Sequence, residues 1–164
     1  MQIALPRPAT GARIAAAAPS RTTVAVAAAL SLGAAWVHLA YVGPHLRQWW
    51  AYGAFFLATG IGQAVFSPLI LRWPRPALAA VGIAGNLAIV GMYVLSRTNG
   101  APLGPHANVP ERVGAVDLAT TAAEVVLIGV LVTILGTTAR TRVADLLVAG
   151  GVIIWTLRLT GHLP

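Results

Sequence analysis

The chain has 164 residues, of which 57% are hydrophobic and 9% are charged, and its formal net charge is +7. Soluble domains usually carry about 25% charged residues, so a water-soluble globule of this size would lack the polar surface it needs. A disordered chain is excluded as well, because such chains are poor in apolar residues. The arginines lie in short gaps between apolar runs instead of along one basic stripe, which argues against a nucleic-acid partner. The sequence therefore predicts an all-α protein, a polytopic transmembrane helical bundle whose partner is the lipid bilayer.

The first 21 residues are rich in alanine and proline and carry Arg7, Arg13 and Arg21. We interpret residues 1–21 as a flexible basic tail and residues 22–164 as the transmembrane bundle. A cleaved signal peptide is the alternative interpretation of this end of the chain. The apolar run after the tail is long enough to span a bilayer and has no clear small-x-small cleavage site behind it, which favours an uncleaved first helix.

Four apolar runs, residues 22–42, 51–71, 77–95 and 115–135, have close to the 20 or so residues that a helix needs to cross a bilayer core. A fifth run, residues 144–159, is shorter and carries Asp145 at its start and Arg158 at its end. It either crosses the membrane at a tilt or lies at the interface, and we favour a fifth span. Six prolines fall in the predicted gaps between helices, where helix breakers belong: Pro44, Pro74, Pro76, Pro102, Pro105 and Pro110.

The distribution of arginine predicts the orientation, because cytoplasmic segments of membrane proteins carry an excess of positive charge. With the N-terminus in the cytoplasm, seven arginines lie on the inner side and four on the outer side. Trp49, Trp50, Tyr52 and Tyr41 gather at the first outer boundary and Trp73 at an inner one, where aromatic side chains anchor to the interface. All eleven basic residues are arginine, a bias typical of GC-rich bacterial genomes. We therefore expect a bacterial plasma-membrane protein with a cytoplasmic N-terminus.

Few polar side chains fall inside the apolar runs, and each costs free energy in a bilayer unless it has a partner or a function. The candidates for a polar core are His38, Gln63, Asn86, Asp117 and Glu124. With the boundaries above and a rise of about 1.5 Å per residue, His38 and Asp117 lie near the outer surface and the other three lie near the midplane. Helical spacing puts one polar or small stripe on each of the four runs. Four inward-facing stripes predict a polar core that opens toward the outside.

Glu124 is the most informative of these residues. A lone carboxylate about nine residues inside a span must be protonated or paired. The candidate partners are an arginine from an outer loop, His38, Gln63 and Asn86. Two interpretations stay open: Glu124 is a hydrogen-bonded strut between helices, or it takes up a proton or binds a cation. For the histidine and the two amides a structural hydrogen bond is the favoured role.

The outer side of the chain holds further candidate residues, namely His45, Arg97, His106 and Glu111, with His162 near the C-terminus. Nitrogen and oxygen ligands of this kind suit zinc or copper. No HExxH, no HxH and no other tight ligand pair occurs, so scattered interfacial histidines are favoured and a metal stays unassigned. Residues 96–105 are rich in turn formers and predict a stiff loop. This loop is either a rigid connector or a cap in which Arg97 points at Asp117 or Glu111.

The motifs of several enzyme classes are absent from the sequence. There is no cysteine, which excludes disulfides, thiolate metal sites and a cysteine nucleophile. The loops lack both the GxxxxGK[ST] phosphate motif and the GxSxG elbow. We identify no catalytic residue and no cofactor, and an enzyme is the less favoured class.

A pattern within residues 35–135 resembles one group of proteins. It comprises His38 and His45, residues 50–56, Gln63, Asn86, the loop 96–105, Val113-Gly114, Asp117 and Glu124. In this pattern the chain looks like uncharacterised small multi-pass membrane proteins of actinobacteria. The resemblance implies a four-helix core in a bacterial plasma membrane, and it implies no activity.

Two classes of function follow from these observations. The first is a structural, accessory or sensor-type membrane component that joins a membrane-protein partner or a homo-oligomer, and its polar core serves packing. The second is a small ion-, proton- or metal-handling protein centred on Glu124, Asp117 and His38. The sequence favours the first class. The second requires that His38, Gln63, Asn86 and Glu124 converge beside an opening, whereas the first makes no such demand.

Overall fold

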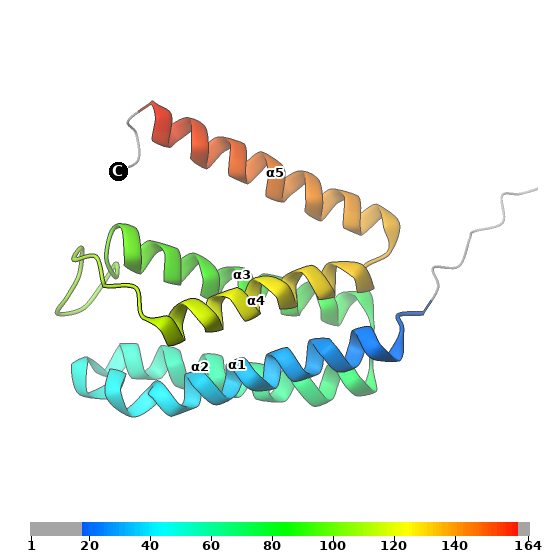
Figure 1. The fold of residues 1–164 in the computed structure, drawn as a ribbon, viewed down its shortest axis with the longest axis horizontal. Helices are drawn as coiled ribbons and strands as arrows, with labels where there is room; N and C mark the ends of the chain where they lie inside the picture. The colour runs from blue at the N-terminus through cyan, green and yellow to red at the C-terminus, as the bar shows by residue number, and fades with distance from the viewer. Residues whose placement is uncertain (1–17, 161–164) are drawn as a thin grey trace, which may run out of the picture.

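The computed structural model describes residues 18–160, which form five α-helices (Figure 1). The helices are α1 (Arg21–Gln48), α2 (Trp50–Arg72), α3 (Pro76–Thr98), α4 (Ala115–Ile134) and α5 (Thr137–Leu159). The first four lie alongside one another as an up-and-down bundle, and α5 stands apart from them. Helices α1 to α4 are each long and apolar enough to cross a membrane. The predicted all-α bundle is confirmed, and the protein is a multi-pass membrane protein.

Local signals in the sequence define the helix ends. The hydroxyl of Ser20 accepts a hydrogen bond from the backbone N–H of Thr23 at 3.0 Å, which satisfies one of the free donors at the start of α1. Trp49 is extended, with φ −166° and ψ 140°, and this single residue separates α1 from α2. Pro76 is the first residue of α3. Its lack of an N–H costs no hydrogen bond there, because N–H groups in the first turn have no partner within the helix.

Helix α1 runs six residues past the predicted end of the first span, from residue 42 to Gln48. The expectation that Pro44 lies in a gap between helices is wrong, because Pro44 lies inside α1. A proline removes one intrahelical hydrogen bond but leaves those of the following residues intact. The N–H of Trp49 accordingly still bonds the carbonyl of His45 at 3.0 Å. This extension moves every polar residue of α1 deeper into the bundle than the sequence suggests.

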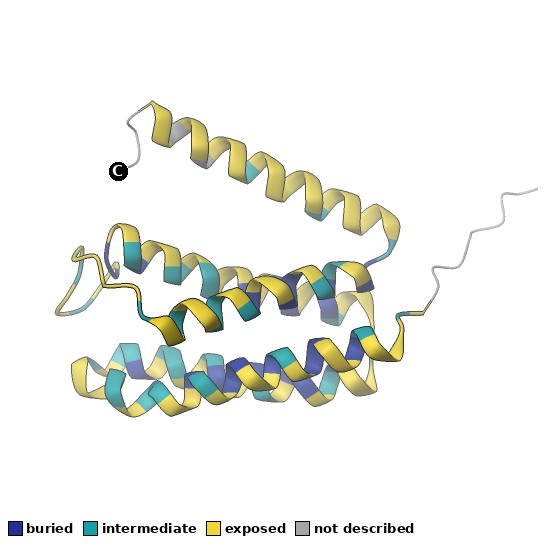
Figure 2. Ribbon diagram, viewed as in Figure 1, coloured by how far each residue is buried: buried dark blue, intermediate teal, exposed yellow. Residues whose placement is uncertain are grey.

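The bundle consists of two closely packed helix pairs. Helix α1 packs along α2, and α3 packs along α4; α1 also contacts α4, whereas α2 and α3 barely touch. The buried residues lie mainly where these four helices face one another (Figure 2). We call the end of the bundle that carries the α1–α2 turn and the α3–α4 loop the loop end. A cavity lined by both pairs lies toward this end and is described below.

Glycines allow α1 and α2 to approach closely. A Cβ atom added to Gly60 would lie 2.7 Å from Cγ of Leu39, and one added to Gly53 would overlap Leu46. The two leucines are seven residues apart on α1, and the two glycines are seven apart on α2, so both contacts lie on one antiparallel face. Small residues at such contacts let helices pack closely in lipid, where the hydrophobic effect does not drive helices together.

Gly60→Leu is expected to lower the free energy of unfolding by about 2 kcal/mol, because the larger side chain forces α1 away from α2. Gly62→Leu is the matched control, since a Cβ atom at Gly62 meets nothing within 4 Å. Thermal unfolding of both variants in one detergent measures the difference. Equal melting temperatures would contradict the close approach of the two helices.

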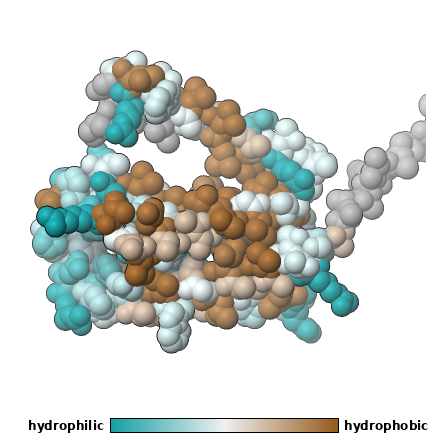
Figure 3. All heavy atoms as spheres, viewed as in Figure 1, coloured by the Kyte–Doolittle hydropathy of each residue, from teal (hydrophilic) through white to brown (hydrophobic). Residues whose placement is uncertain are grey.

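The apolar core occupies the half of the bundle away from the loop end. Its fully buried members are Ala27, Ile70, Ala79, Leu127 and Leu131. Large apolar side chains also cover the outside, where Trp36 is 77% exposed and Val81 is 66% exposed. Figure 3 shows apolar residues gathered across the middle of the visible face, with more polar residues toward the ends. This surface suits contact with lipid acyl chains.

Helix α5 begins seven residues before the predicted fifth run and differs from the other helices. It is not among the helices that qualify as membrane spans, and its charged residues are Arg140, Arg142, Asp145 and Arg158. None of its described side chains is buried, so it is almost wholly exposed in Figure 2. Figure 3 shows an open gap between this helix and the bundle. A fifth span therefore stays a prediction, and so does the interfacial alternative.

Candidate functional site

Four polar side chains from four different helices meet inside the bundle. They are His38 of α1, Gln63 of α2, Asn86 of α3 and Glu124 of α4, and none is more than 6% exposed. The amide nitrogen of Gln63 lies 3.2 Å from Oδ1 of Asn86 and 3.2 Å from Oε1 of Glu124. Nε2 of His38 lies 3.7 Å from the same Glu124 oxygen. We call these four residues the polar cluster.

Hydrogen bonds fix the orientation of the two amides in the polar cluster. Nδ2 of Asn86 donates to the carbonyl of Gly82 at 2.8 Å, so Oδ1 of Asn86 faces Gln63 as an acceptor. Gln63 must therefore present its NH₂ group to both Asn86 and Glu124, and its own Oε1 is buried without a hydrogen-bond partner. One NH₂ group thus serves two acceptors. The polar cluster has more acceptors than donors.

The imidazole of His38 adds a further acceptor. Its Nδ1 lies 2.9 Å from the carbonyl oxygen of Ala34, and because a carbonyl only accepts, Nδ1 carries the proton. In the neutral ring Nε2 then has only a lone pair, and this lone pair faces the Glu124 carboxyl at 3.7 Å. Two buried acceptors at this distance are unfavourable unless a proton or a cation joins them.

The two-layer arrangement expected from the sequence is wrong for His38. With a rise of about 1.5 Å per residue, His38 lies about 15 Å from the end of α1 at Gln48, and Glu124 lies about 14 Å from the start of α4. The two residues therefore share one depth, because α1 is longer than predicted. Asp117, the fifth predicted core residue, lies apart from the polar cluster in the first turn of α4.

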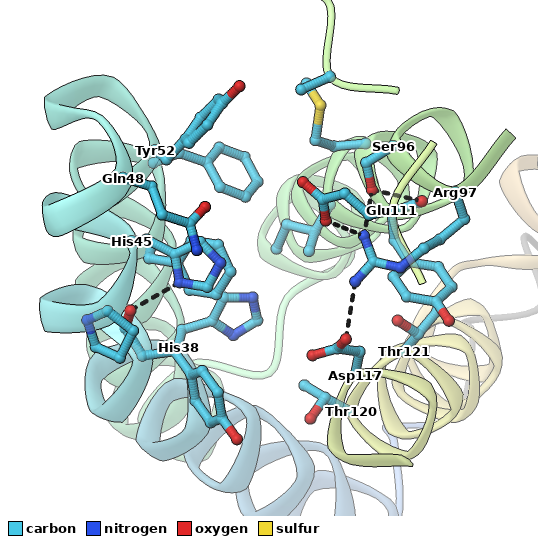
Figure 4. Close-up of a pocket in the computed structure, with 18 of the residues that line it drawn as sticks. His38, His45, Gln48, Tyr52, Ser96, Arg97, Glu111, Asp117, Thr120 and Thr121 are labelled. Carbon is cyan, nitrogen blue, oxygen red and sulfur yellow. Dashed lines mark hydrogen bonds and ion pairs between the residues drawn. The ribbon is translucent and has the colours of Figure 1, made fainter. Parts of the chain in front are cut away.

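A cavity of about 490 Å³ leads from the loop end to the polar cluster, and both His38 and Glu124 line it. Figure 4 shows its two walls: His38, His45 and Tyr52 belong to the α1–α2 side, whereas Arg97 and Asp117 belong to the α3–α4 side. Beyond the polar cluster, the apolar core fills the bundle as far as the α2–α3 turn. The polar cluster is therefore open to the loop end and shut off from the opposite end.

Arg97 lies in the last turn of α3 and not in the outer loop where the sequence placed it, and it links the α3–α4 loop to α4. Its guanidinium contacts the carboxylate of Glu111 and lies 2.8 Å from Oδ2 of Asp117. The same guanidinium lies 4.9 Å from the centre of the Tyr93 ring, close enough for a cation–π contact. Arg97 thus meets both of the acids at which the sequence suggested it points. Asp117 and Glu111 have a cationic partner, in contrast to Glu124.

The loop between α3 and α4 has a defined structure at the mouth of the cavity. The N–H of Asn108 donates to the carbonyl of Ala101 at 3.0 Å, and the hydroxyl of Tyr52 donates to the carbonyl of Leu103 at 2.8 Å. Gly100 has φ 87°, in the left-handed region that favours glycine. The loop is therefore held to α2 as well as to α4.

His45 and His106 do not join the polar cluster. His45 lies in α1, not in a loop, and its ring stacks on Phe56 with 3.7 Å between the centroids. His106 is exposed in the α3–α4 loop and lines a smaller pocket, and His162 lies outside the described residues. Within residues 18–160, no group of three His, Asp or Glu side chains is placed to hold a metal ion. The metal-handling form of the second hypothesis gains no support from this geometry.

Sequence reasoning missed the aromatic lining of the cavity. Tyr41 of α1, Phe55 and Phe56 of α2, and Tyr93 of α3 all line it. Aromatic side chains in spans usually pack against lipid or other helices, so their type alone does not reveal a pocket. Their common signal is position, because all four lie within about two helical turns of the loop end.

Comparison of the chain with protein-family models, with curated proteins and with solved structures finds no match. The resemblance to actinobacterial membrane proteins accordingly stays an expectation from the sequence. The function has to be inferred from the geometry of the polar cluster and its cavity.

Proposed function

We propose that this membrane protein binds a proton or a small cation between His38 and Glu124, and that the ligand enters from the loop end. It acts as a proton- or cation-responsive component of the membrane, which joins the sensor class to the ion-handling class. The arginine distribution favours a cytoplasmic N-terminus, and the loop end then faces away from the cytoplasm. The bacterial plasma membrane is the proposed location.

The observation that carries this proposal is the contact between Nε2 of His38 and Oε1 of Glu124 at 3.7 Å. The hydrogen bond from His38 to Ala34 leaves Nε2 as an acceptor, so the pair lacks a donor until a proton or a cation arrives. A pair built only to hold helices together would place a donor opposite the carboxyl, as Gln63 does.

Other ionisable groups near this pair belong to its electrostatic surroundings. They line the same cavity from every helix packed around it and from the loop: Tyr41, His45, Tyr52, Tyr93, Arg97, Glu111, Arg112 and Asp117. The two acids of this set meet Arg97, and the lining also holds Arg112, so these two acids and two arginines add no net charge to the cavity. Glu124 is the carboxyl group whose charge state the cavity leaves open.

The apolar core argues for binding and response over conduction. Fully buried Leu127 and Leu131 follow Glu124 on α4, and Ile70 faces them from α2 within one core. Ser31 and Ser67 are buried near this core, but their hydroxyls are engaged with the backbone carbonyls of Gln63 and Ala28. A bound ion would therefore stop at the polar cluster instead of crossing the bundle.

A structural role accounts for other polar residues of the bundle. The hydroxyl of Ser31 donates to the carbonyl of Gln63 at 2.8 Å, and that of Ser67 donates to the carbonyl of Ala28 at 2.9 Å. These bonds join α1 to α2 and need no ligand. The two serines and the amide of Gln63 therefore join the helices, whereas the His38–Glu124 contact is left for binding.

The test is a pH titration of the protein in lipid nanodiscs, followed by infrared spectroscopy of the carboxyl C=O stretch. We expect a protonated-carboxyl band that appears and disappears with pH and is lost in Glu124→Gln. Asp145→Asn is the matched control, because it removes one exposed carboxylate from α5. Glu111, Asp117 and Asp145 also give carboxyl bands, so the result that would overturn the proposal is a pH titration that Glu124→Gln leaves unchanged.

A second measurement keeps the test independent of how the variant folds. Nitrogen NMR of histidine-labelled wild-type protein distinguishes protonated from unprotonated ring nitrogens. We expect Nε2 of His38 to gain a proton, in concert with the change at Glu124, while Nδ1 stays protonated. An Nε2 that never changes across the titration counts against the proposal.

A further inference from the structure

We propose that the cavity binds a small organic cation with a primary ammonium group, whose N–H donors reach His38 and Glu124 and whose apolar body lies against the aromatic walls. This inference rests on the proposed function, since both use the same pair of residues. The proposed function does not say which cation binds, and this inference names its chemical class.

The first argument is the size and lining of the cavity. Its volume of about 490 Å³ exceeds what a proton or a bare metal ion needs and falls within the roughly 300–1,000 Å³ range of small-molecule sites. Phe55, Phe56 and Tyr41 line the α1–α2 side, and Tyr93 and Met92 line the α3 side. Such walls favour an apolar body, whereas a hydrated inorganic ion would gain nothing from them.

The second argument is the charge of the cavity. Arg97 contacts both Glu111 and Asp117 near the mouth, so these acids already have a cationic partner. Glu124, at the deep end, makes its hydrogen-bond and ion-pair contacts only with Gln63 and His38 among the described residues. A cation that enters the cavity therefore finds its unpaired carboxylate at the inner end.

The third argument concerns the chemistry of the cationic group. Nε2 of His38 and the carboxyl of Glu124 are two acceptors 3.7 Å apart, and a primary ammonium carries three donors that can serve both. A guanidinium binds a carboxylate most strongly through both oxygens, and Oε1 of Glu124 already accepts from Gln63. A quaternary ammonium has no N–H donor to offer either acceptor.

The position of Phe56 supports the same ligand. Its ring centroid lies 5.5 Å from that of His38 and 3.7 Å from that of His45. An ammonium at His38 would thus lie near the Phe56 ring, and aromatic rings attract cations more strongly when water is excluded. The aromatic wall contributes to binding of the charged group as well as of the apolar body.

The test uses 2-phenylethylammonium as the probe and nanodiscs that carry the full chain. Calorimetry should show saturable binding to the wild-type protein and binding about tenfold weaker to Glu124→Gln, because a charge-assisted hydrogen bond is lost. Asp145→Asn serves as the matched control and should bind as the wild type does. Empty nanodiscs correct for partition of the probe into lipid.

Two analogues of the probe test which part of it is recognised. 2-Phenylethanol keeps the apolar body without the charge, and the trimethylammonium analogue keeps the charge without N–H donors. Both should bind about tenfold or more weakly than the primary ammonium. Equal binding of either analogue would overturn the inference, and so would binding of the primary ammonium that Glu124→Gln leaves unchanged.

The two proposals fail in different ways. A pH-dependent Glu124 band together with no saturable binding of 2-phenylethylammonium would overturn the ammonium inference and leave the proposed function standing. Absence of that band from the wild-type protein would overturn the proposed function, and the inference would fall with it.

Discussion

Gln63→Leu is expected to lower the free energy of unfolding by about 2 kcal/mol, which is large for one polar residue between membrane helices. The NH₂ group of Gln63 is the donor for both Asn86 and Glu124, so its removal leaves two buried acceptors without that partner. An unsatisfied buried acceptor costs more than the bond itself contributes. Unfolding of the purified protein in mixed micelles with increasing SDS measures the change.

Two further variants make this result specific. Gln48→Leu makes the same substitution at an exposed position at the end of α1, and it should change stability little. Asn86→Leu removes only one of the two bonds made by Gln63 and should cost about half as much as Gln63→Leu. A Gln63→Leu protein as stable as the Gln48→Leu protein would show that the polar cluster does not hold the helices together.

Arg97→Met is expected to release the α3–α4 loop, with amide hydrogen exchange in residues 101–112 about tenfold faster. The guanidinium side chain is 14% exposed and joins Glu111 of the loop to Asp117 of α4. Both acids are more than a third exposed, so water screens their ion pairs with Arg97. Loss of these pairs should therefore loosen the loop and change the free energy of unfolding only slightly. Mass spectrometry of deuterium uptake measures it.

Arg112→Met is the control for this variant, because Arg112 lies in the same loop, is exposed and has no ion pair within the described residues. It removes an equal charge and should leave the exchange of the loop unchanged. Equal acceleration in both variants would mean that net charge, and not the contacts of Arg97, governs the order of the loop.

The fold was predictable from the sequence to the extent that lipid imposes it. Runs of about 20 apolar residues form spanning helices in a bilayer, so the ends of α2, α3 and α4 lie within three residues of the predicted ends. The end of α1 was not predictable from the same rule, because Pro44 suggests a break that the residues after it do not make. The same rule does not decide the position of α5, because its charged composition fits both a transmembrane span and an interfacial helix.

The candidate site was predictable in its residues and not in its arrangement. Buried His38, Gln63, Asn86 and Glu124 stand out because polar groups are rare in apolar runs. Which of them touch depends on the rotation and offset of the helices, which small contacts such as that between Leu39 and Gly60 determine. The direction of the His38 ring depends on a single bond to a backbone carbonyl, and no sequence pattern encodes it.

The order of these helices along the chain bears on how the protein is made. Ribosomes deliver the N-terminal part first, so the close pair of α1 and α2 reaches the bilayer before α4 has been synthesised. That early hairpin brings His38 and Gln63 with it. Glu124, which is costly to leave unpaired in lipid, is the last of the four to be inserted, and its amide donor Gln63 is then already in the bilayer. The order of synthesis thus lets Glu124 meet its hydrogen-bond donor as soon as α4 enters the bilayer.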